Sequence, residues 1–335
     1  MLFRSNKVSL LFCLFLLLAE YGFASIIIQG DISTDTTFLM SNNPHQIRGQ
    51  VRVLDGALLT IEPGVNLMFE NGSSLEIQGQ IYAVGSSALP IWFHSIDNDQ
   101  YYTRVYLNGA EGSSFSHCAF SRSNDGAALM RIVNSGTINL LHCDFSTSIY
   151  GHGIYINNST VNINYVDINS IAQNGIQIEG NGTVNINDVD VNGCNKGICV
   201  VQNSYPTLSM ENVVLHSCAS YPIEASIINY SVMGYVNAYN CPNRFLAIWD
   251  TNLYSSYTLP NTNVPYYLKS NLSWGSGAVF TLEPGVSLHF GQHGKIFFGG
   301  GASLLANGTE ALPISFLAVG DRKSTRLNSS HGKLS

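Results

Sequence analysis

The sequence is poor in charged residues, and poorest in basic ones. Only 11% of its 335 residues are charged, and 15 Lys and Arg stand against 22 Asp and Glu, a net charge of −7. This composition is typical of β-rich extracellular repeat proteins rather than of cytosolic α/β enzymes. Nucleic acid and anionic lipid both bind to positive surfaces, so the composition argues against either as a partner.

The chain also lacks a hydrophobic run long enough to cross a membrane. The apolar run from Val8 to Ala19 has 12 residues, whereas a spanning helix needs about 20. Arg4 and Lys7 precede this run and small residues follow it, so residues 1–24 are predicted to be a secretory signal peptide. We therefore expect a secreted, extracellular or cell-surface protein with no membrane span in the visible chain.

The last residues break the pattern of the chain before them. Residues 321–335 read DRKSTRLNSSHGKLS, which resembles a translated sequencing adapter. We interpret 321–335 as an adapter artefact and leave it out of the fold analysis; a natural basic tail is the alternative. Without both ends, which hold six basic and two acidic residues, 9 basic residues face 20 acidic ones, a net charge of −11.

A short repeat fills the middle of the chain. Alternating apolar and polar positions predict half-buried strands, and the Asn and Gly residues between them suit tight turns. A second strand recurs every 22 residues, as GIYIN, GIQIE and GICVV from Gly153, Gly175 and Gly197. The first strand of each unit starts 23 to 25 residues after the last, as EGSSFSHCAFS (Glu111), GTINLLHCDFS (Gly136), STVNINYVDIN (Ser159), GTVNINDVDVN (Gly182) and PTLSMENVVLH (Pro206).

This spacing predicts a solenoid with one coil of about 23 residues per repeat. A propeller repeats at about 40–50 residues, and a leucine-rich repeat carries a Leu/Asn consensus, so neither fits. Stacked coils bury a continuous core that no single coil could form. The expected fold class is therefore all-β, a parallel β-helix.

A longer repeat overlies the short one. The segment GALLTIEPGVNLMF at Gly56–Phe69 recurs in similar form as GAVFTLEPGVSLHF at Gly277–Phe290. Each copy resembles the opening coils of a module. We therefore predict a first module at 25–250, a linker at 251–270 that is rich in Tyr, Asn, Ser and Pro, and a truncated second module at 271–320.

The LTIEPGV pattern, with the Gly, Ala and Pro-Ile positions that follow it, resembles the opening of right-handed parallel β-helix modules. Such modules have the pectin-lyase-like fold and occur in bacterial surface proteins and in animal cell-junction proteins of the bark-beetle type. The resemblance runs from Ile47 to Gly320. It implies a right-handed helix, but it implies little about activity, because function depends on sites added to a fold.

The cysteines are expected to be buried apolar residues. No pair has the CxxC spacing of a zinc site. In the repeat, Cys118 and Cys143 share an inward column, and Cys194, Cys218 and Cys241 share another. Stacked side chains point in parallel, which makes the disulfide torsion unfavourable.

One outward column of the repeat is acidic. Asp144, Asp167 and Asp190 occupy equivalent positions in successive coils, and Asp188 lies two residues before Asp190. Carboxylates one strand spacing apart could bind Ca²⁺ or act as acid and base on a polysaccharide. Family members that cleave acidic polysaccharides use stacked carboxylates in this way. The alternative is a polar face that only keeps the sheet in solution.

Two further features accompany the acidic column. A polysaccharide lyase requires a basic residue beside its acids, and Lys196 is the nearest one in sequence. Solvation of its turn is the favoured explanation for it. His117, His142 and Tyr165 form a neighbouring column, for which cross-strand pairing is favoured over sugar or metal binding.

Two functions remain open from the sequence. The first is a non-catalytic extracellular scaffold or adhesion module that binds a polysaccharide, another glycan or a cell-surface protein. The second is a polysaccharide lyase or glycoside hydrolase at the stacked carboxylates, with Asp144, Asp167, Asp190 and Lys196 as the catalytic candidates. No cofactor is required for the first, and calcium is the candidate for the second, at Asp144, Asp167, Asp188 and Asp190.

Overall fold

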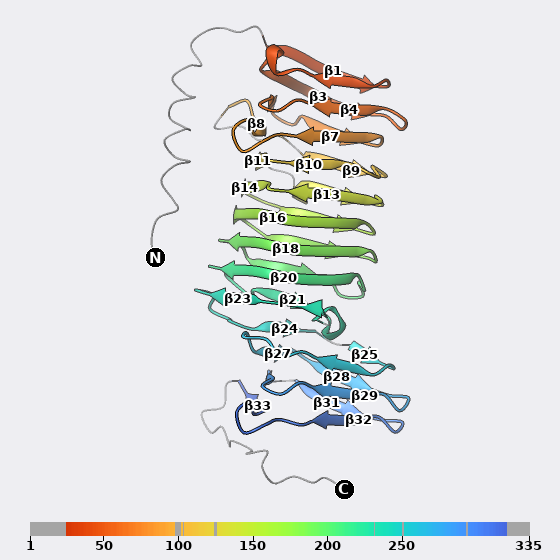
Figure 1. Cartoon of the computed structure of the whole chain (residues 1–335), viewed down its shortest axis with the longest axis vertical. Coiled ribbons are helices and arrows are strands. Elements are labelled where there is room, and N and C mark those ends of the chain that lie inside the picture. Colours follow the sequence, from red (N-terminus) through yellow and green to blue (C-terminus); the bar gives the residue numbers. More distant parts are fainter. Residues whose placement is uncertain are drawn as a thin grey trace.

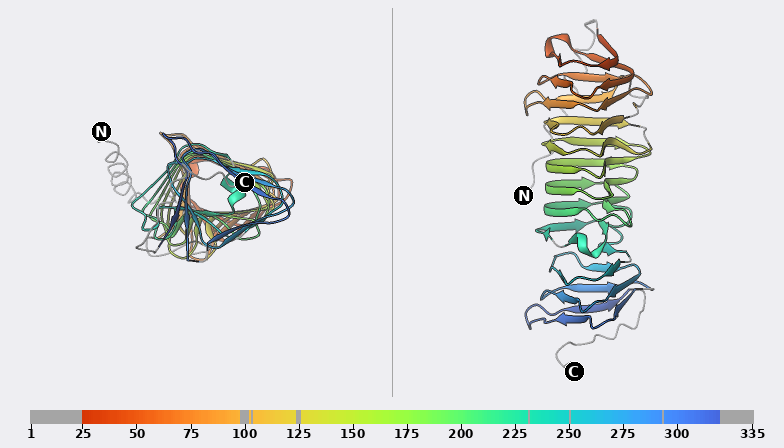
Figure 2. Two further views of the ribbon diagram at one scale, coloured as in Figure 1. Left: turned by 90° about the horizontal axis from the view of Figure 1, so that it is seen from below. Right: turned by 90° about the vertical axis from the view of Figure 1, so that its right-hand side faces the viewer.

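The computed structural model describes residues 25–97, 102, 104–123, 126–230, 232–249, 251–292 and 294–319. The predicted signal peptide and adapter segment lie outside these residues. The described chain is a right-handed parallel β-helix of about 12 turns with roughly 23 residues per turn. The coils stack into an elongated prism (Figure 1), and they superpose in a closed outline when seen along the axis (Figure 2). The fold predicted from the repeat is confirmed.

Each coil contributes a strand to each of three faces. Two short 3-10 helices, η1 (Met40–Asn42) and η2 (Ile227–Tyr230), are the only helices among the described residues. The first strand, β1 (Ile26–Ile32), pairs with β3 along both halves of its length. Face I contains the second half of β3 (His45–Val53), β6 (Ser74–Ile77), β9 (Arg104–Asn108), β12 (Ala128–Val133), β15 (His152–Asn157), β17 (Asn174–Glu179), β19 (Lys196–Val200), β21 (Ile223–Ala225), β24 (Leu246–Ile248), β27 (Tyr266–Leu268), β30 (Ser287–Phe290) and β33 (Ser315–Ala318).

Faces II and III complete the prism up to residue 239. Face II contains β2 (Thr36–Phe38), β4 (Leu58–Ile61), β7 (Gln80–Val84), β10 (Ser114–Ser116), β13 (Thr137–Leu141), the first halves of β16 (Thr160–Ile171), β18 (Thr183–Asn192) and β20 (Thr207–His216), and β22 (Val232–Met233). Face III contains the first half of β3, β5 (Asn66–Phe69), β8 (Ile91–Ser95), β11 (Cys118–Ser123), β14 (Asp144–Ser148), the second halves of β16, β18 and β20, and β23 (Val236–Tyr239).

A single left-handed residue turns the chain from face II to face III. His117, His142, Tyr165, Asp188 and Asn212 have φ between 47° and 55°, one in each of five successive coils. His, Asp and Asn are among the non-glycine residues that adopt this conformation most readily. Because one residue makes the corner, two adjacent side chains point outward there, and the period-two alternation is interrupted.

The core is a set of apolar columns that run along the axis. Phe93, Phe120 and Phe145 lie on consecutive coils of face III and have no exposed surface. Their ring centroids are 4.5 and 4.7 Å apart, and the rings are stacked. The predicted inward cysteine column is also present, since Cys118 and Cys143 are each about 1% exposed. All six described cysteines are free thiols, and Cys241 alone of these six is only half-buried.

Residues 251–270 differ from the irregular linker expected from their composition. They form β25 (Thr251–Leu253), β26 (Tyr257–Leu259) and β27, which pair with β28 (Asn271–Trp274), β29 (Val279–Leu282) and β30. The alternation is hidden in the sequence because Tyr257 and Tyr266 fill inward positions of these short strands. This segment is therefore a coil of the helix.

The prism is nevertheless interrupted at this point. Strands β25, β28 and β31 (Lys295–Phe298) form one separate three-stranded sheet, and β26, β29 and β32 (Ser303–Ala306) form another. Among the described residues, only face I continues across the break, through the pairing of β21, β24 and β27. The second EPGV motif consequently ends in a strand of face I, whereas the first ends in a strand of face III. The division of the chain into two modules stays a prediction, and this break lies where that division was placed.

Candidate functional site

The acidic column has the register predicted for it. Asp144 lies opposite Asp167, and Asp167 lies opposite Asp190, on strands β14, β16 and β18 of face III. The column has three rungs, because Ala119 precedes Asp144 and Val214 follows Asp190. We call these three aspartates the acidic ladder. Asp144 and Asp167 are exposed, and Asp190 is partly exposed.

The ladder perturbs its own ionisation. Partial desolvation and, secondly, the charge of Asp167 raise the pKa of Asp144 to about 6. The pKa of Asp167 is raised by the same two causes, with Asp190 as the neighbouring charge. Like charges one strand spacing apart disfavour each other's ionised form, which is the expected sign.

The last rung of the ladder has a partner that the sequence did not reveal. His216 Nε2 lies 2.9 Å from Asp190 Oδ1. His216 occupies the position opposite Asn192, two residues beyond Asp190 on β18, and its ring stacks on Tyr239 with a centroid distance of 4.7 Å. This diagonal contact across strands occupies one carboxylate oxygen of Asp190.

Asp188 does not share the outward row of the ladder. Its φ of 52° places it at the corner between faces II and III, and its Oδ2 accepts a hydrogen bond of 2.8 Å from Asn187 Nδ2. In the described part of the chain, no three His, Cys, Asp or Glu side chains are gathered where they could hold a metal ion. We therefore derive no chemistry through calcium at these residues.

Lys196 lies on a different face from the acidic ladder. It is the first residue of β19 on face I, and its Nζ is 3.3 Å from Glu224 Oε1. Its side chain is 22% exposed, so it belongs to a local ion-pair network rather than simply solvating a turn. The structure shows no contact that joins Lys196 to an aspartate of the ladder.

The ring column at the corner is paired along the axis. The centroids of His117 and His142 are 4.8 Å apart, as are those of His142 and Tyr165. Because the rings lie over one another, their faces are mostly occupied and their edges meet solvent. Such stacking is the cross-strand pairing that the sequence favoured.

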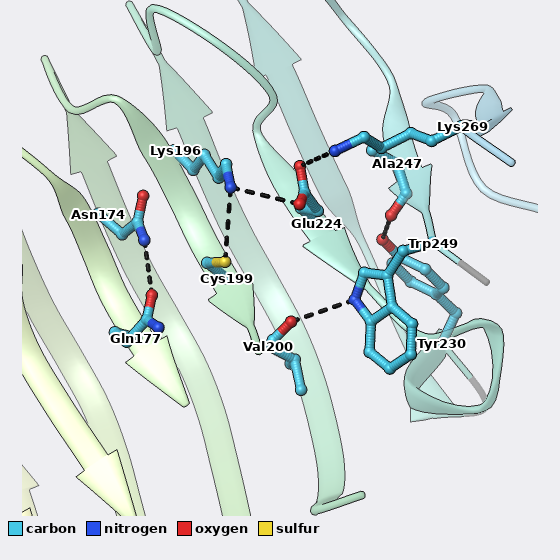
Figure 3. Close-up of polar contacts among 10 residues, drawn as sticks. All are labelled: Asn174, Gln177, Lys196, Cys199, Val200, Glu224, Tyr230, Ala247, Trp249 and Lys269. Atoms are coloured by element: carbon cyan, nitrogen blue, oxygen red, sulfur yellow. Dashed lines mark hydrogen bonds and ion pairs between the residues drawn. The ribbon is translucent and has the colours of Figure 1, made fainter. Parts of the chain in front are cut away.

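A hollow of about 370 Å³ lies on face I, lined by residues between 152 and 249 on the successive strands β15 to β24. Its lining includes His152, together with Asn174, Gln177, Lys196, Glu224 and Trp249 (Figure 3). Glu224 receives Lys196 on one oxygen and Lys269 on the other, the latter at 2.9 Å, and its side chain is 12% exposed. We call this feature the face I hollow.

Sequence reasoning missed the face I hollow because its residues come from five different coils. Lys196 was the only one of them that the sequence singled out. Glu224 and Lys269 are 45 residues apart in the chain, and the short repeat is weak in both of their coils. Glu224 is in register with Cys199 and Ala247, not with either lysine, so their proximity can be read only once the register of β19, β21 and β24 is known.

Comparison with protein-family models finds no match to this chain. Over 73 residues, or 22% of the chain, it is 38% identical to "Protein bark beetle" of Drosophila melanogaster, and this stretch is 2% of the length of that relative. The described residues contain no helix that is both long and apolar enough to span a membrane.

Two solved structures are similar in part. The Dettilon tailspike protein (gp208) has 11% identity, with 82% of this chain and 62% of the tailspike covered and a TM-score of 0.33. The Streptococcus pneumoniae surface protein and adhesin PfbA has 10% identity, with 86% and 91% covered and a TM-score of 0.27.

Proposed function

We propose that this protein is a secreted or cell-surface β-helix scaffold that binds a glycan or a protein partner on its flat outer faces and performs no chemistry on it. The observation that carries this proposal is the separation of the candidate catalytic groups. The acidic ladder lies on face III, while Lys196 lies on face I and is engaged by Glu224. A lyase needs a base and a charge-neutralising cation at the same sugar ring.

The outer faces support a binding role because they carry regular polar ladders. On face II, Asn185 Nδ2 donates to Asn162 Oδ1, and Asn162 Nδ2 donates to Asn139 Oδ1, both at 2.8 Å. Ser209 Oγ donates to Asn185 Oδ1 at the same distance. These bonds fix the amides in place, so the surface pays little entropy when a partner binds.

A second candidate, a glycoside hydrolase at the acidic ladder, rests on one observation. The pKa of Asp144 is raised to about 6, and a second carboxyl group, that of Asp167, lies one strand away, as an acid and base pair requires. Two observations argue against a hydrolase: the ladder lies on a flat sheet, and His216 already contacts one carboxylate oxygen of Asp190. A hydrolase also encloses its substrate in a cleft. No aspartate of the ladder lines the face I hollow, nor a second hollow on earlier coils that is lined by Asp35, Asp55 and Glu111 among others.

The experiment is a binding screen of the full chain against immobilised extracellular glycans and cell-surface proteins, with product analysis of every glycan that is retained. The proposal expects saturable retention of at least one partner and no cleavage of it. Cleavage that is lost in the Asp144→Asn/Asp167→Asn/Asp190→Asn variant contradicts the proposal and favours the hydrolase. Absence of any saturable partner contradicts both.

A further inference from the structure

The face I hollow holds an excess of positive charge in an acidic protein. Glu224 lies between two ammonium groups, at 3.3 Å from Lys196 and 2.9 Å from Lys269. One carboxylate cannot neutralise two lysines, so the cluster keeps a net charge of about +1. The chain as a whole carries −7. A local positive centre within a negative surface attracts an anionic group to this place.

The hollow also contains a buried acceptor without a donor. Asn174 is 7% exposed, and its Oδ1 has no hydrogen-bond partner. Its Nδ2 donates to Gln177 Oε1 at 2.6 Å, which fixes the orientation of the amide (Figure 3). An unpaired buried carbonyl oxygen costs about 1–3 kcal/mol, and a ligand hydroxyl placed there would remove that cost.

His152 supplies a donor on the same wall. Its Nδ1 accepts the backbone N–H of Asn174 at 3.1 Å, so the proton of the neutral ring lies on Nε2. Burial and, secondly, the charge of Lys196 lower the pKa of His152 to about 4, which keeps the ring neutral at physiological pH. The ring therefore offers one N–H without adding a charge.

The remaining walls are suited to the body of a small polar ligand. The indole Nε1 of Trp249 is already bonded to Val200 O at 3.2 Å, so Trp249 contributes ring surface. Cys199 and Val200 present small side chains beside it. The volume of about 370 Å³ lies at the lower end of the range for small-molecule sites, about 300–1,000 Å³.

We propose that the face I hollow binds one acidic sugar residue of a glycan, with its carboxylate on Lys196 and Lys269 and a hydroxyl on Asn174 Oδ1. A carboxylate would neutralise the excess positive charge, and an adjacent hydroxyl would donate a hydrogen bond to the unpaired acceptor. A ligand that carries both groups therefore matches the hollow. The inference rests on the proposed binding function and names the ligand class and its place. It assigns binding to face I rather than to the acidic ladder, which would repel a carboxylate.

The test is calorimetric titration of the full chain with a tetrasaccharide that contains glucuronic acid, beside a neutral glucose tetrasaccharide. We expect saturable binding of the acidic probe alone, weakened by added salt. Lys196→Gln and Asn174→Ala should each lower the affinity by about tenfold or more, the scale of one charge-assisted or buried hydrogen bond. Lys295→Gln, an exposed lysine of β31 outside the hollow, is the matched control and should bind unchanged.

The two hollow variants, Lys196→Gln and Asn174→Ala, test the inference independently of each other. Circular dichroism checks that each of them is folded. Equal binding of the acidic and neutral probes, or unchanged affinity in both hollow variants, overturns the inference while leaving a glycan-binding scaffold intact. Failure of the proposed function looks different, because the binding screen then yields no saturable partner of any class. Loss of binding in the ladder variant Asp167→Asn, with the hollow variants unaffected, would place the site on face III instead.

Discussion

Asp144→Asn should stabilise the protein at neutral pH and leave it unchanged in acid. The pKa of Asp144 is raised from an ordinary value of 3.8 to about 6 in the folded chain. Below pH 3.8 the carboxyl is protonated in both states, so its contribution to folding is zero. As the pH rises towards 6 the unfolded state releases the proton first, and the folded state loses stability. Above pH 6 that loss is complete, and the neutral Asn avoids it.

The size of the effect follows from the position of the ladder. A shift of this size would correspond to about 3 kcal/mol at 1.36 kcal/mol per unit. Asp144 is exposed, and solvent screening reduces the interaction of surface charges to about 1 kcal/mol or less. We therefore expect Asp144→Asn to gain about 1 kcal/mol at pH 7.5 in low salt, or about 2 °C in Tm.

The assay is thermal unfolding of both proteins at pH 3.5 and at pH 7.5, with and without added salt. Asp55→Asn, which replaces an exposed carboxylate of a turn outside the ladder, serves as the matched control and should show a smaller pH-dependent gain. A variant that is no more stable than the parent at pH 7.5, or a gain of equal size at both pH values, would refute the account of the ladder.

Two further predictions concern the packing of the coils. Phe120→Ala removes the central ring of the stacked column and should cost about 3–5 kcal/mol, measured by denaturant unfolding with Phe120→Leu as a milder control. Gly175→Ala should cost about 1–3 kcal/mol, because its Cβ would lie 2.5 Å from Val191 Cγ1 and 2.8 Å from the carbonyl oxygen of Gly197; unchanged stability would contradict the close approach of these coils.

The repeat made the fold predictable because each coil repeats the same few requirements. Inward positions such as Val161 and Val184 must be apolar, and they face each other in the register that the alignment implied. The acidic ladder followed from the same alignment, since equal positions in successive coils must stack. Prediction was therefore most successful where a property depends on one coil and its neighbour.

The features that the sequence did not reveal depend on corners or on distant coils. The corners between faces II and III were not predicted, because a single left-handed residue adds one outward side chain without any change in composition. The coil at 251–270 was hidden because tyrosines such as Tyr266 replace the usual Val and Ile. The face I hollow can be recognised only when the register of several coils is known. Nothing in the sequence around Glu224 indicates its two lysine partners.

The central claim is that this β-helix binds an extracellular partner without acting on it. The most direct measurement incubates the full chain with the glycan or protein that it retains, and follows retention and release of products together. The account predicts saturable retention and an intact partner after prolonged incubation. Steady release of cleaved product by the parent chain, abolished by Asp167→Asn, would contradict it and make the acidic ladder a catalytic site.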